Sequence, residues 1–375
     1  MRDFFMLKER KTRKSQRIGC VLAGLYLCAN IILSYRLIYN EFYQEIHGQI
    51  ETNQMDHKMV YPFGEIVGIY TECKGVFVID TCEIETIEND FVNPAKNILQ
   101  TGDYILEING NALDKKEMLV KAINDCNGDD LELKILRGKK VLHTTITPIL
   151  AKNNKYMIGT WIKDDLAGVG TITYYTEEGA FAALGHGMGD GVTNELIEVK
   201  GGDIYRSEIA GIKKGKRGEP GEVKGVIYYG LGNHLGELYT NCGEGIYGIL
   251  DDEEKESYQR ECEPYEVADK AEIKVGKAQI ISSISGRRQI YDIQINYVDY
   301  LALNSNKGLH IEVTDDKLLE LTGGIVQGMS GSPILQDGEI VGAVTHVLVN
   351  DPTRGYGIFI EDMLEAAQQV AEERR

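Results

Sequence analysis

The sequence has little proline, almost no tryptophan, and no cysteine spacing typical of a metal or redox motif. Its 375 residues include 7 Pro, 1 Trp and 7 Cys, without any C-x-x-C pair. The cysteines therefore do not indicate a zinc site or a thioredoxin-like centre. Positive charge is also scarce, with 40 Lys and Arg against 58 Asp and Glu. Such an acidic chain excludes non-specific binding of DNA or RNA, which requires contacts to phosphates.

Nucleotide-binding and metal-binding patterns are absent as well. No Walker motif occurs, and no G-x-G-x-x-G follows a strand pattern in the required context. His186 and Asp190 lie close in the sequence, but no third metal ligand follows at a suitable spacing. We therefore expect no cofactor and no metal. The 42 Gly and 21 Tyr favour strands and tight turns, and 43% hydrophobic residues are enough to bury cores.

A basic segment followed by an uncharged stretch stands at the start of the sequence. Residues 1–17 contain seven Lys and Arg and two acidic residues, and residues 18–35 contain no charged side chain. Eighteen uncharged positions are just enough for a helix to cross the hydrocarbon core. We expect a transmembrane signal-anchor with a cytoplasmic N-terminus and export of the rest. A cleaved signal peptide is the alternative, but no A-x-A-like site follows directly.

Residues 36–60 are polar, and we interpret them as a partly helical stalk between the membrane and the first domain. An exposed stalk is easily cut, so it is either a spacer or a cleavage site that releases the rest. Five cysteines lie beyond the anchor. An odd number cannot all pair with one another, and the sequence allows a disulfide without selecting its partners.

Residues 61–150 have the pattern of a small separate domain. EIVGIYT and GVFVID alternate like strands, and GDYILEINGN combines a strand with a hairpin turn. This order resembles the PDZ domain of bacterial peptidases, in which a peptide adds a strand beside a carboxylate-binding loop. The resemblance places Phe63 and Gly64 in that loop and Gly68 on the strand that pairs with the peptide. A covered groove is the alternative.

Residues 151–375 predict one large, mainly β domain. Short strand patterns such as GVGTITYYT, GVIYYGLG and GYGIFIED alternate with Gly-rich turns. Only Glu361–Arg375 shows sustained helical spacing of apolar residues. Many short strands followed by one helix favour a barrel or a sandwich over a Rossmann fold.

Two glycine-flanked segments of this domain carry reactive side chains. ALGHG holds His186 between two glycines, and GGIVQGMSGSPI holds Ser330 between Gly328 and Gly331. A nucleophilic serine needs a base, a tight turn and backbone N–H groups that face the developing oxyanion. A neutral His186 suits the base, and the N–H groups of Gly328 and Ser330 suit the oxyanion hole. Taken singly, each segment is more often a structural turn.

The order of His before Ser in an exported β domain resembles that of chymotrypsin-like peptidases. The resemblance implies a chymotrypsin-like double β-barrel with a C-terminal helix. It also places one strand, VGAVTHV, at the edge of the substrate cleft, with the cleft residues Thr345, His346 and Val347. A plain surface position on a strand is the alternative for His346.

A more specific family resemblance emerges when five features are taken together: the anchor, the PDZ-like pattern, ALGHG, TGGIVQGMSGSPI and VGAVTHV. This combination is similar to the SpoIVB family of serine peptidases and extends over nearly the whole chain. The resemblance implies a sporulation signalling peptidase that works between mother cell and forespore. It further implies self-cleavage, and cutting of the inhibitory partner of an intramembrane protease that processes the sigma-K precursor. The family's Ser, His and Asp fall on Ser330, His186 and Asp315.

The acid that would orient the histidine has several candidates. Asp315 lies 129 residues after His186 and 15 before Ser330, whereas the acid of chymotrypsin-like enzymes normally lies nearer the middle of that interval. Asp315 also fits the N-cap of a helix over residues 316–321. Asp190 and Asp203 are rivals for the role.

Two classes of function follow from these patterns. The leading hypothesis is a membrane-anchored serine endopeptidase that acts on protein substrates, its own stalk included, with a PDZ domain that gates or delivers peptide. The alternative is a catalytically inactive PDZ-containing binding or scaffold protein in the intermembrane space. A serine-directed covalent probe separates the two hypotheses, because only the enzyme presents an activated serine.

Overall fold

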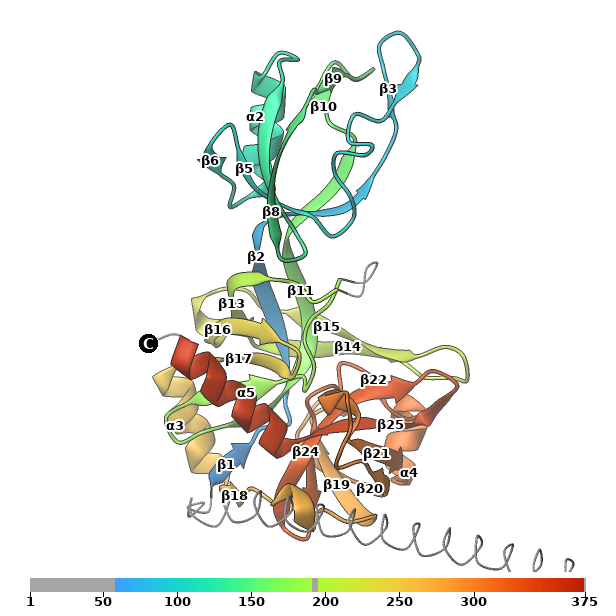
Figure 1. Cartoon of the computed structure of the whole chain (residues 1–375). Coiled ribbons are helices and arrows are strands. Elements are labelled where there is room, and N and C mark those ends of the chain that lie inside the picture. The colour runs from blue at the N-terminus through green and yellow to red at the C-terminus, as the bar shows by residue number, and fades with distance from the viewer. Residues whose placement is uncertain (1–57, 191–194, 374–375) are drawn as a thin grey trace, which may run out of the picture. The chain divides into compact units, whose positions relative to one another are not determined.

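The computed structural model describes residues 58–190 and 195–373 (Figure 1). The predicted basic segment, the membrane anchor and nearly all of the stalk, residues 1–57, lie outside the described residues. Within the described ranges, no helix is long and apolar enough to cross a membrane. The described residues from Met59 onward belong to one compact unit.

The first barrel consists of six strands that close on themselves. Strand β2 pairs with both β13 and β11, which completes the ring β11-β12-β17-β16-β13-β2. Its strands are β2 (Ile66–Thr81), β11 (Thr160–Tyr175), β12 (Ala180–Ala183), β13 (Val199–Tyr205), β16 (His234–Cys242) and β17 (Gly245–Leu250). Buried Phe63, Ile69, Phe181 and Leu238 fill its interior. The short strands β1 (Met59–Pro62) and β18 (Tyr265–Glu266) extend the same sheet beyond β11.

The second barrel is also closed and has the strand order β19-β20-β21-β25-β24-β23. Its strands are β19 (Gly276–Ser282), β20 (Gln289–Val298), β21 (Leu309–Val313), β23 (Pro333–Gln336), β24 (Glu339–Leu348) and β25 (Asp351–Phe359). Alternation sets the two faces: Leu309, Ile311 and Val313 are buried, whereas the residues between them are partly exposed. The final helix α5 (Ile360–Glu373) packs Met363 and Leu364 against buried residues from both barrels.

A smaller unit is inserted into the first barrel, and we call residues 74–165 the insert unit. The second half of β2 and the first half of β11 pair with each other and continue into it (Figure 1). Its own elements are β3 (Ile84–Glu85), β4 (Phe91–Val92), β5 (Tyr104–Ile108), β6 (Asn111–Ala112), α2 (Lys116–Asp125), β7 (Leu131–Arg137), β8 (Lys140–Ile146), β9 (Ile149–Leu150) and β10 (Tyr156–Met157). Val76, Ile105, Leu119 and Leu133 are buried in a core separate from those of the barrels.

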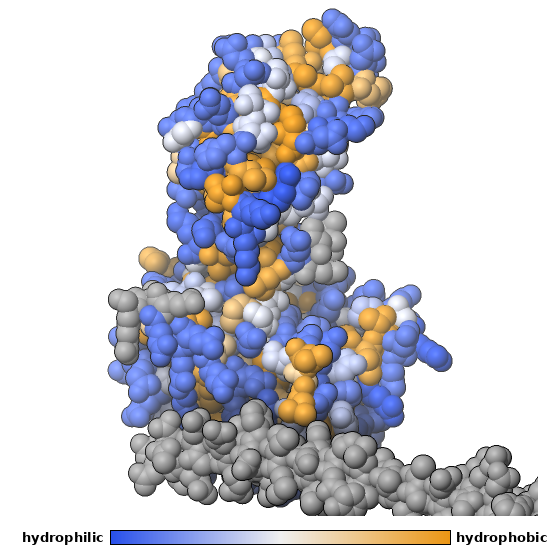
Figure 2. Space-filling view, viewed as in Figure 1, coloured by the Kyte–Doolittle hydropathy of each residue, from blue (hydrophilic) through white to orange (hydrophobic). Residues whose placement is uncertain are grey.

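The remaining elements connect or flank the barrels. They are the strands β14 (Ser207–Lys213), β15 (Gly221–Ile227) and β22 (Val326–Gln327), the helices α3 (Asp252–Glu261) and α4 (Asp316–Thr322), and the short 3₁₀ helices η1 (Leu231–Asn233), η2 (Lys270–Glu272) and η3 (Ser305–Lys307). The cysteines of the described residues are free, so the disulfide that the sequence allowed is not formed there. On the face shown in Figure 2, hydrophilic residues predominate and apolar patches are separate.

The prediction of a mainly β protein that ends in a helix is confirmed. The strands of the two barrels account for this result. In each barrel they form a closed sheet whose inner face is buried. The sequence patterns did not show that β2 and β11 each run through a barrel and the insert unit as single strands of 16 residues.

Candidate active site

Ser330 lies in a tight turn between β22 and β23. The N–H of Met329 donates to the Val326 carbonyl at 3.1 Å, and the N–H of Ser332 donates to the Met329 carbonyl at 2.9 Å. Gly331 has φ of +94°, and a Cβ at this position would lie 2.0 Å from the Thr171 carbonyl oxygen. Only glycine therefore fits directly after the serine, as the G-x-S-G-x-P pattern indicated.

Backbone hydrogen bonds attach this turn to both barrels. Thr171 of β11 donates its N–H to the Ser330 carbonyl at 3.0 Å and its hydroxyl to the Gly328 carbonyl at 2.8 Å. On the other side, the N–H of Gly331 donates to the Val344 carbonyl of β24 at 2.7 Å. Because one anchor comes from each barrel, the serine is fixed where the two barrels meet.

Two backbone amides of the turn have no hydrogen-bond acceptor among the described residues. The N–H groups of Gly328 and Ser330 donate to none of these residues, while their neighbours Met329 and Gly331 are engaged. Gly328 has φ of +104°, which directs its amide in a way that non-glycine residues rarely allow. These two unengaged amides, two positions apart in the chain, provide the donors that a developing oxyanion requires.

His186 follows β12 at a strained turn. Leu184 and Gly185 have φ of +69° and +66°, which reverses the chain directly before the histidine. The half-buried ring of His186 has its Nδ1 2.9 Å from the Gly187 carbonyl oxygen. Since a carbonyl can only accept, Nδ1 carries the proton and the Nε2 lone pair remains available. Burial lowers the pKa of His186 below the ordinary value of 6.5, which favours this neutral form near pH 7.

Strand β24 brings the serine and the histidine segments to one place. The Ser330 hydroxyl donates to the Thr345 carbonyl at 2.7 Å, and the next residue, His346, lies with its ring centroid 4.9 Å from that of His186. Burial, then His186 and Lys307, lower the pKa of His346 to about 4, so both rings are neutral at pH 7. Ser330 and His186 are thus joined through two successive residues of β24.

The three predicted cleft residues have different surroundings. His346 contacts His186 directly. The Thr345 side chain is 2% exposed and donates to the Asn306 carbonyl at 2.6 Å, so it supports the neighbouring η3 turn. Val347 is half-buried and packs against the core of the second barrel. Of this set, only the ring of His346 faces the histidine that the sequence analysis selected.

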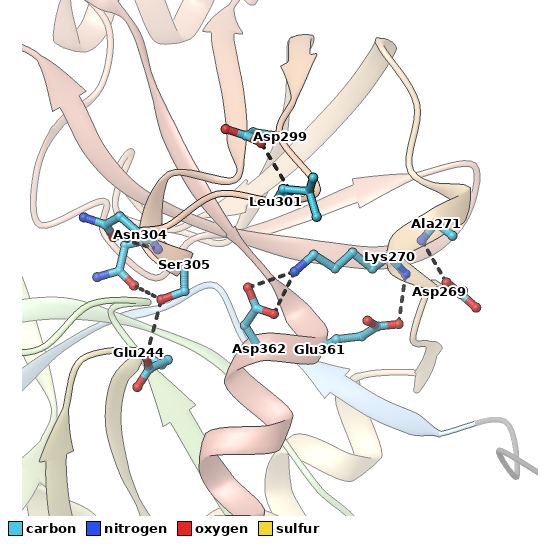
Figure 3. A network of polar contacts seen from close by, with 11 residues as sticks. Glu244, Asp269, Lys270, Ala271, Asp299, Leu301, Asn304, Ser305, Glu361 and Asp362 are labelled. Atoms are coloured by element: carbon cyan, nitrogen blue, oxygen red, sulfur yellow. Dashed lines mark hydrogen bonds and ion pairs between the residues drawn. The ribbon is translucent and has the colours of Figure 1, made fainter. Parts of the chain in front are cut away.

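The η3 turn that receives Thr345 is itself held by polar contacts. Figure 3 shows the Ser305 hydroxyl directed at Glu244, with the two oxygens 3.4 Å apart. Close by, Lys270 forms an ion pair with Asp362 at 3.0 Å. A cavity of about 260 Å³ opens here, and neither Ser330 nor His186 lines it. A cavity of about 400 Å³ in the insert unit is also lined by neither residue. The two cavities therefore do not indicate where the reactive residues lie.

The structure does not bring Asp315 to His186. The Asp315 carboxylate accepts from the Leu318 N–H at 2.9 Å and caps α4, and its other oxygen lies 3.5 Å from the Asp292 N–H. Asp315 comes two residues after the end of β21 and immediately before α4, so the unpaired N–H groups at the helix start attract its carboxylate. In this structure Asp315 is therefore the N-cap of α4, which was one of the two roles that the sequence allowed.

The rival acids are held by other side chains. Asp190 is 3% exposed and forms an ion pair with Lys163 at 2.6 Å. Asp203 lies 3.2 Å from Nε2 of His234, a different histidine. Within the described residues, the recorded hydrogen-bond partner of the His186 ring is therefore a backbone carbonyl rather than a carboxylate.

The prediction that Phe63, Gly64 and Gly68 line the peptide groove of a PDZ domain is wrong. Phe63 is 2% exposed inside the first barrel, and a Cβ on Gly64 would lie 2.5 Å from Ile281 of the second barrel. Gly68 pairs with Val169 of β11 on one side and with Tyr205 of β13 on the other. A peptide cannot add to a strand whose two edges are already paired. These residues belong to the region of the two barrels, and the alternation of the sequence predicted a strand without showing its partners.

Sequence reasoning missed the residues that hold the nucleophile turn. Thr171 supplies two of its hydrogen bonds, and although Thr345 was expected in the cleft, its role as the carbonyl acceptor of the serine was not predicted. A threonine in an alternating strand carries no sequence signal for such contacts. The motif around Ser330 was visible only because the tight turn demands glycines at fixed positions.

Comparison with known proteins agrees with this geometry. The family model described as SpoIVB peptidase S55 matches residues 154–364. The chain belongs to this family of serine peptidases. No curated protein matches the chain. The family match covers β11, His186, Ser330 and β24, which are the parts that meet in the site.

Solved structures with local similarity include peptidases and an isolated PDZ domain. The PDZ domain of an SdrC-like protein from Listeria monocytogenes has 26% identity, 24% coverage of this chain, 87% coverage of that chain and a TM-score of 0.20. The HtrA-type protease AlgW with decapeptide has 13% identity, 57% and 54% coverage of the two chains and a TM-score of 0.33. The Rv3671c protease of M. tuberculosis H37Rv, in an inactive form, has 11% identity, 54% and 84% coverage and a TM-score of 0.30.

Proposed function

We propose that the chain is a serine endopeptidase in which Ser330 is the nucleophile and His186 is the general base. The observation that carries this assignment is the turn of Ser330, where the hydroxyl stands beside two unengaged amides and next to the strand that holds His346 against His186. Family membership supports the reaction class. The N–H groups of Gly328 and Ser330 are assigned to the oxyanion hole.

The reaction requires the serine hydroxyl to leave its present hydrogen bond. In the structure the Ser330 hydroxyl donates to the Thr345 carbonyl, so its Oγ must rotate toward Nε2 of His186 when substrate binds. The proton then passes from Oγ to Nε2 while Oγ bonds to the substrate carbonyl carbon, and the carbonyl oxygen becomes an oxyanion. Collapse of this intermediate breaks the C–N bond, and Nε2 returns the proton to the leaving amine. Water releases the acyl group by the same steps.

The biological role that we propose is sporulation signalling at a membrane. The resemblance of the whole sequence to the SpoIVB family supports an anchored peptidase that cleaves its own stalk and an inhibitory partner of an intramembrane protease. The basic residues before the uncharged stretch 18–35 support a cytoplasmic N-terminus, with the peptidase in the space between mother cell and forespore. Cleavage within residues 36–60 would release the enzyme from its anchor.

Substitution of Ser330 tests the assignment. We expect Ser330→Ala to abolish cleavage of peptides and of the stalk, and to remove labelling by a fluorophosphonate probe, while the circular dichroism spectrum remains unchanged. Ser285→Ala is a matched control, because Ser285 is an exposed serine of a loop in the second barrel. Cleavage by purified Ser330→Ala protein at the wild-type rate would refute the assignment. An unlabelled, inactive wild-type protein would instead favour the binding or scaffold alternative.

A further inference from the structure

A row of rings crosses the outer face of the second barrel and ends at His186. Four residues on neighbouring strands are paired in register, and we call them the aromatic row: Tyr297, His310, Tyr356 and His346. Tyr297 of β20 pairs with His310 of β21, His310 pairs with Tyr356 of β25, and Tyr356 pairs with His346 of β24.

The rings contact one another along most of the row. The ring centroids of Tyr297 and His310 are 5.1 Å apart, and those of His310 and Tyr356 are 4.9 Å apart. Both pairs are edge-to-face, at 86° and 82°. At the other end, the ring of His346 is 4.9 Å from that of His186. The row therefore continues from the surface of the barrel to the proposed general base.

The barrel core does not account for these rings. The chain neighbours of Tyr297 and His310 on their strands, Val298, Leu309 and Ile311, are at most 7% exposed and fill the interior. Side chains alternate across a strand, so the aromatic row points outward. Tyr297 is 53% exposed, and the other three rings are half-buried. Rings that are not needed for the core but are held in fixed positions on the outside indicate a contact surface.

Polar groups border the row on both sides. The Lys307 ammonium lies 5.3 Å from the centre of the Tyr356 ring. Toward the far end of the same strands, Glu312 forms an ion pair with Arg354 at 3.2 Å. An apolar centre with a charged border is the usual composition of a protein-binding surface. In the row itself, Nδ1 of His346 is buried without a hydrogen-bond partner in the described structure.

We propose that the aromatic row binds the polypeptide substrate, and that it takes aromatic or aliphatic side chains located within about five residues of the scissile bond. Neighbouring strands are about 4.8 Å apart, so the row covers about 14 Å, and an extended peptide advances about 3.3 Å per residue. The occupant is the substrate because the row is continuous with the reactive residues. This inference rests on the proposed peptidase function and adds the substrate class that the enzyme prefers.

A comparison of a long and a short substrate tests the proposal. The probes are a peptide library made by tryptic digestion and p-nitrophenyl acetate, which is too small to reach beyond Ser330. We expect wild-type cleavage sites to be enriched in aromatic or aliphatic residues within about five positions. We expect Tyr297→Ala/Tyr356→Ala to lose this preference and to cleave a preferred peptide with kcat/KM about tenfold lower, mainly through KM. Acetate hydrolysis should not change.

Three controls make the outcome decisive. Tyr356→Phe keeps the ring and should retain the preference. Tyr229→Ala removes a similarly exposed tyrosine, 57% against 53% for Tyr297, from a loop of the first barrel, and should change neither rate. An unchanged cleavage profile in the double variant, or equal losses on the peptide and the acetate, would overturn the proposal. Cleavage by Ser330→Ala at the wild-type rate would instead reject the peptidase assignment itself.

Discussion

Two histidines of the first barrel have opposite surroundings. His234, at the start of β16, lies between two carboxylates, with Nδ1 2.7 Å from Asp251 and Nε2 3.2 Å from Asp203. The recorded neighbours of the His186 ring are the Gly187 carbonyl and the ring of His346. Contact between a histidine and an aspartate is often a sign of catalysis, yet in this protein it occurs at His234 and not at the histidine that β24 links to the serine turn.

The difference determines which histidine can accept a proton. Burial alone would lower the pKa of His234, but Asp251 and Asp203 together outweigh it and raise the pKa. Both of its ring nitrogens are engaged, so no lone pair is free. Burial lowers the pKa of His186, whose Nε2 stays available. The proposed role of general base therefore falls to the histidine whose Nε2 lone pair is available, and contact with a carboxylate does not by itself identify such a base.

Replacing His186 and His234 in separate variants should give the largest difference in kcat. We expect His186→Ala to lower kcat by about 10⁴-fold or more, nearly as much as Ser330→Ala, because the two residues act as a unit. His234→Gln should keep kcat within a few-fold, because this residue only supports the local structure. Steady-state hydrolysis of p-nitrophenyl acetate and of one peptide measures both variants. A loss of kcat in stable His234→Gln protein that equals the loss in His186→Ala would contradict the comparison.

The two histidines should also respond to pH in opposite directions. The base must be neutral, so kcat/KM should decline only as pH falls through the pKa of His186, below 6.5. The raised pKa of His234 adds stability that is fully present below pH 6.5 and is lost as pH rises through its folded-state pKa. Activity should therefore be lost at acid pH, through protonation of His186. The stability contributed by protonated His234 should be lost at alkaline pH.

Asp251→Asn separates the two effects. The substitution removes one carboxylate from His234 and leaves His186 unchanged, so it should flatten the alkaline decrease in Tm without moving the acid limb of kcat/KM. Melting curves and rate profiles between pH 5 and pH 9 measure both quantities. If the acid limb moved in this variant, the two histidines would be coupled, and the distinction between a structural and a reactive histidine would fail.

The sequence was most informative where chemistry constrains the backbone. The glycines around Ser330 had to be glycines, because a Cβ on Gly331 would collide with the Thr171 carbonyl. The alternating pattern of EIVGIYT predicted a strand correctly, but its partners depend on residues more than 90 positions away, such as Val169. The resulting error assigned Phe63 and Gly68 to a peptide groove. Asp315 posed a third kind of problem, since an acid after a strand suits both a helix cap and an orienting acid.

Replacement of Asp315 distinguishes these two roles and has the smallest expected effect on stability. Asp315→Ala removes the acceptor for the Leu318 N–H, and the free energy of unfolding should fall by about 1 kcal/mol. Asp315→Asn keeps an acceptor oxygen, so it should restore most of this loss. Asp316→Ala, at the first position of α4, is the matched control and should cost less, because it removes only a favourable charge near the helix start. Urea unfolding measures all three variants.

Activity of the same variants then decides the remaining question about the acid. If Asp315→Asn is as stable as the wild type and its kcat changes by less than tenfold, Asp315 acts as a helix cap, and the carbonyl of Gly187 is enough to hold the His186 tautomer. A stable Asp315→Asn protein with kcat reduced about 10³-fold would show that Asp315 takes part in catalysis. Asp315 would then have to leave α4 and reach His186 in the substrate-bound enzyme, and the two histidines of the first barrel would resemble each other after all.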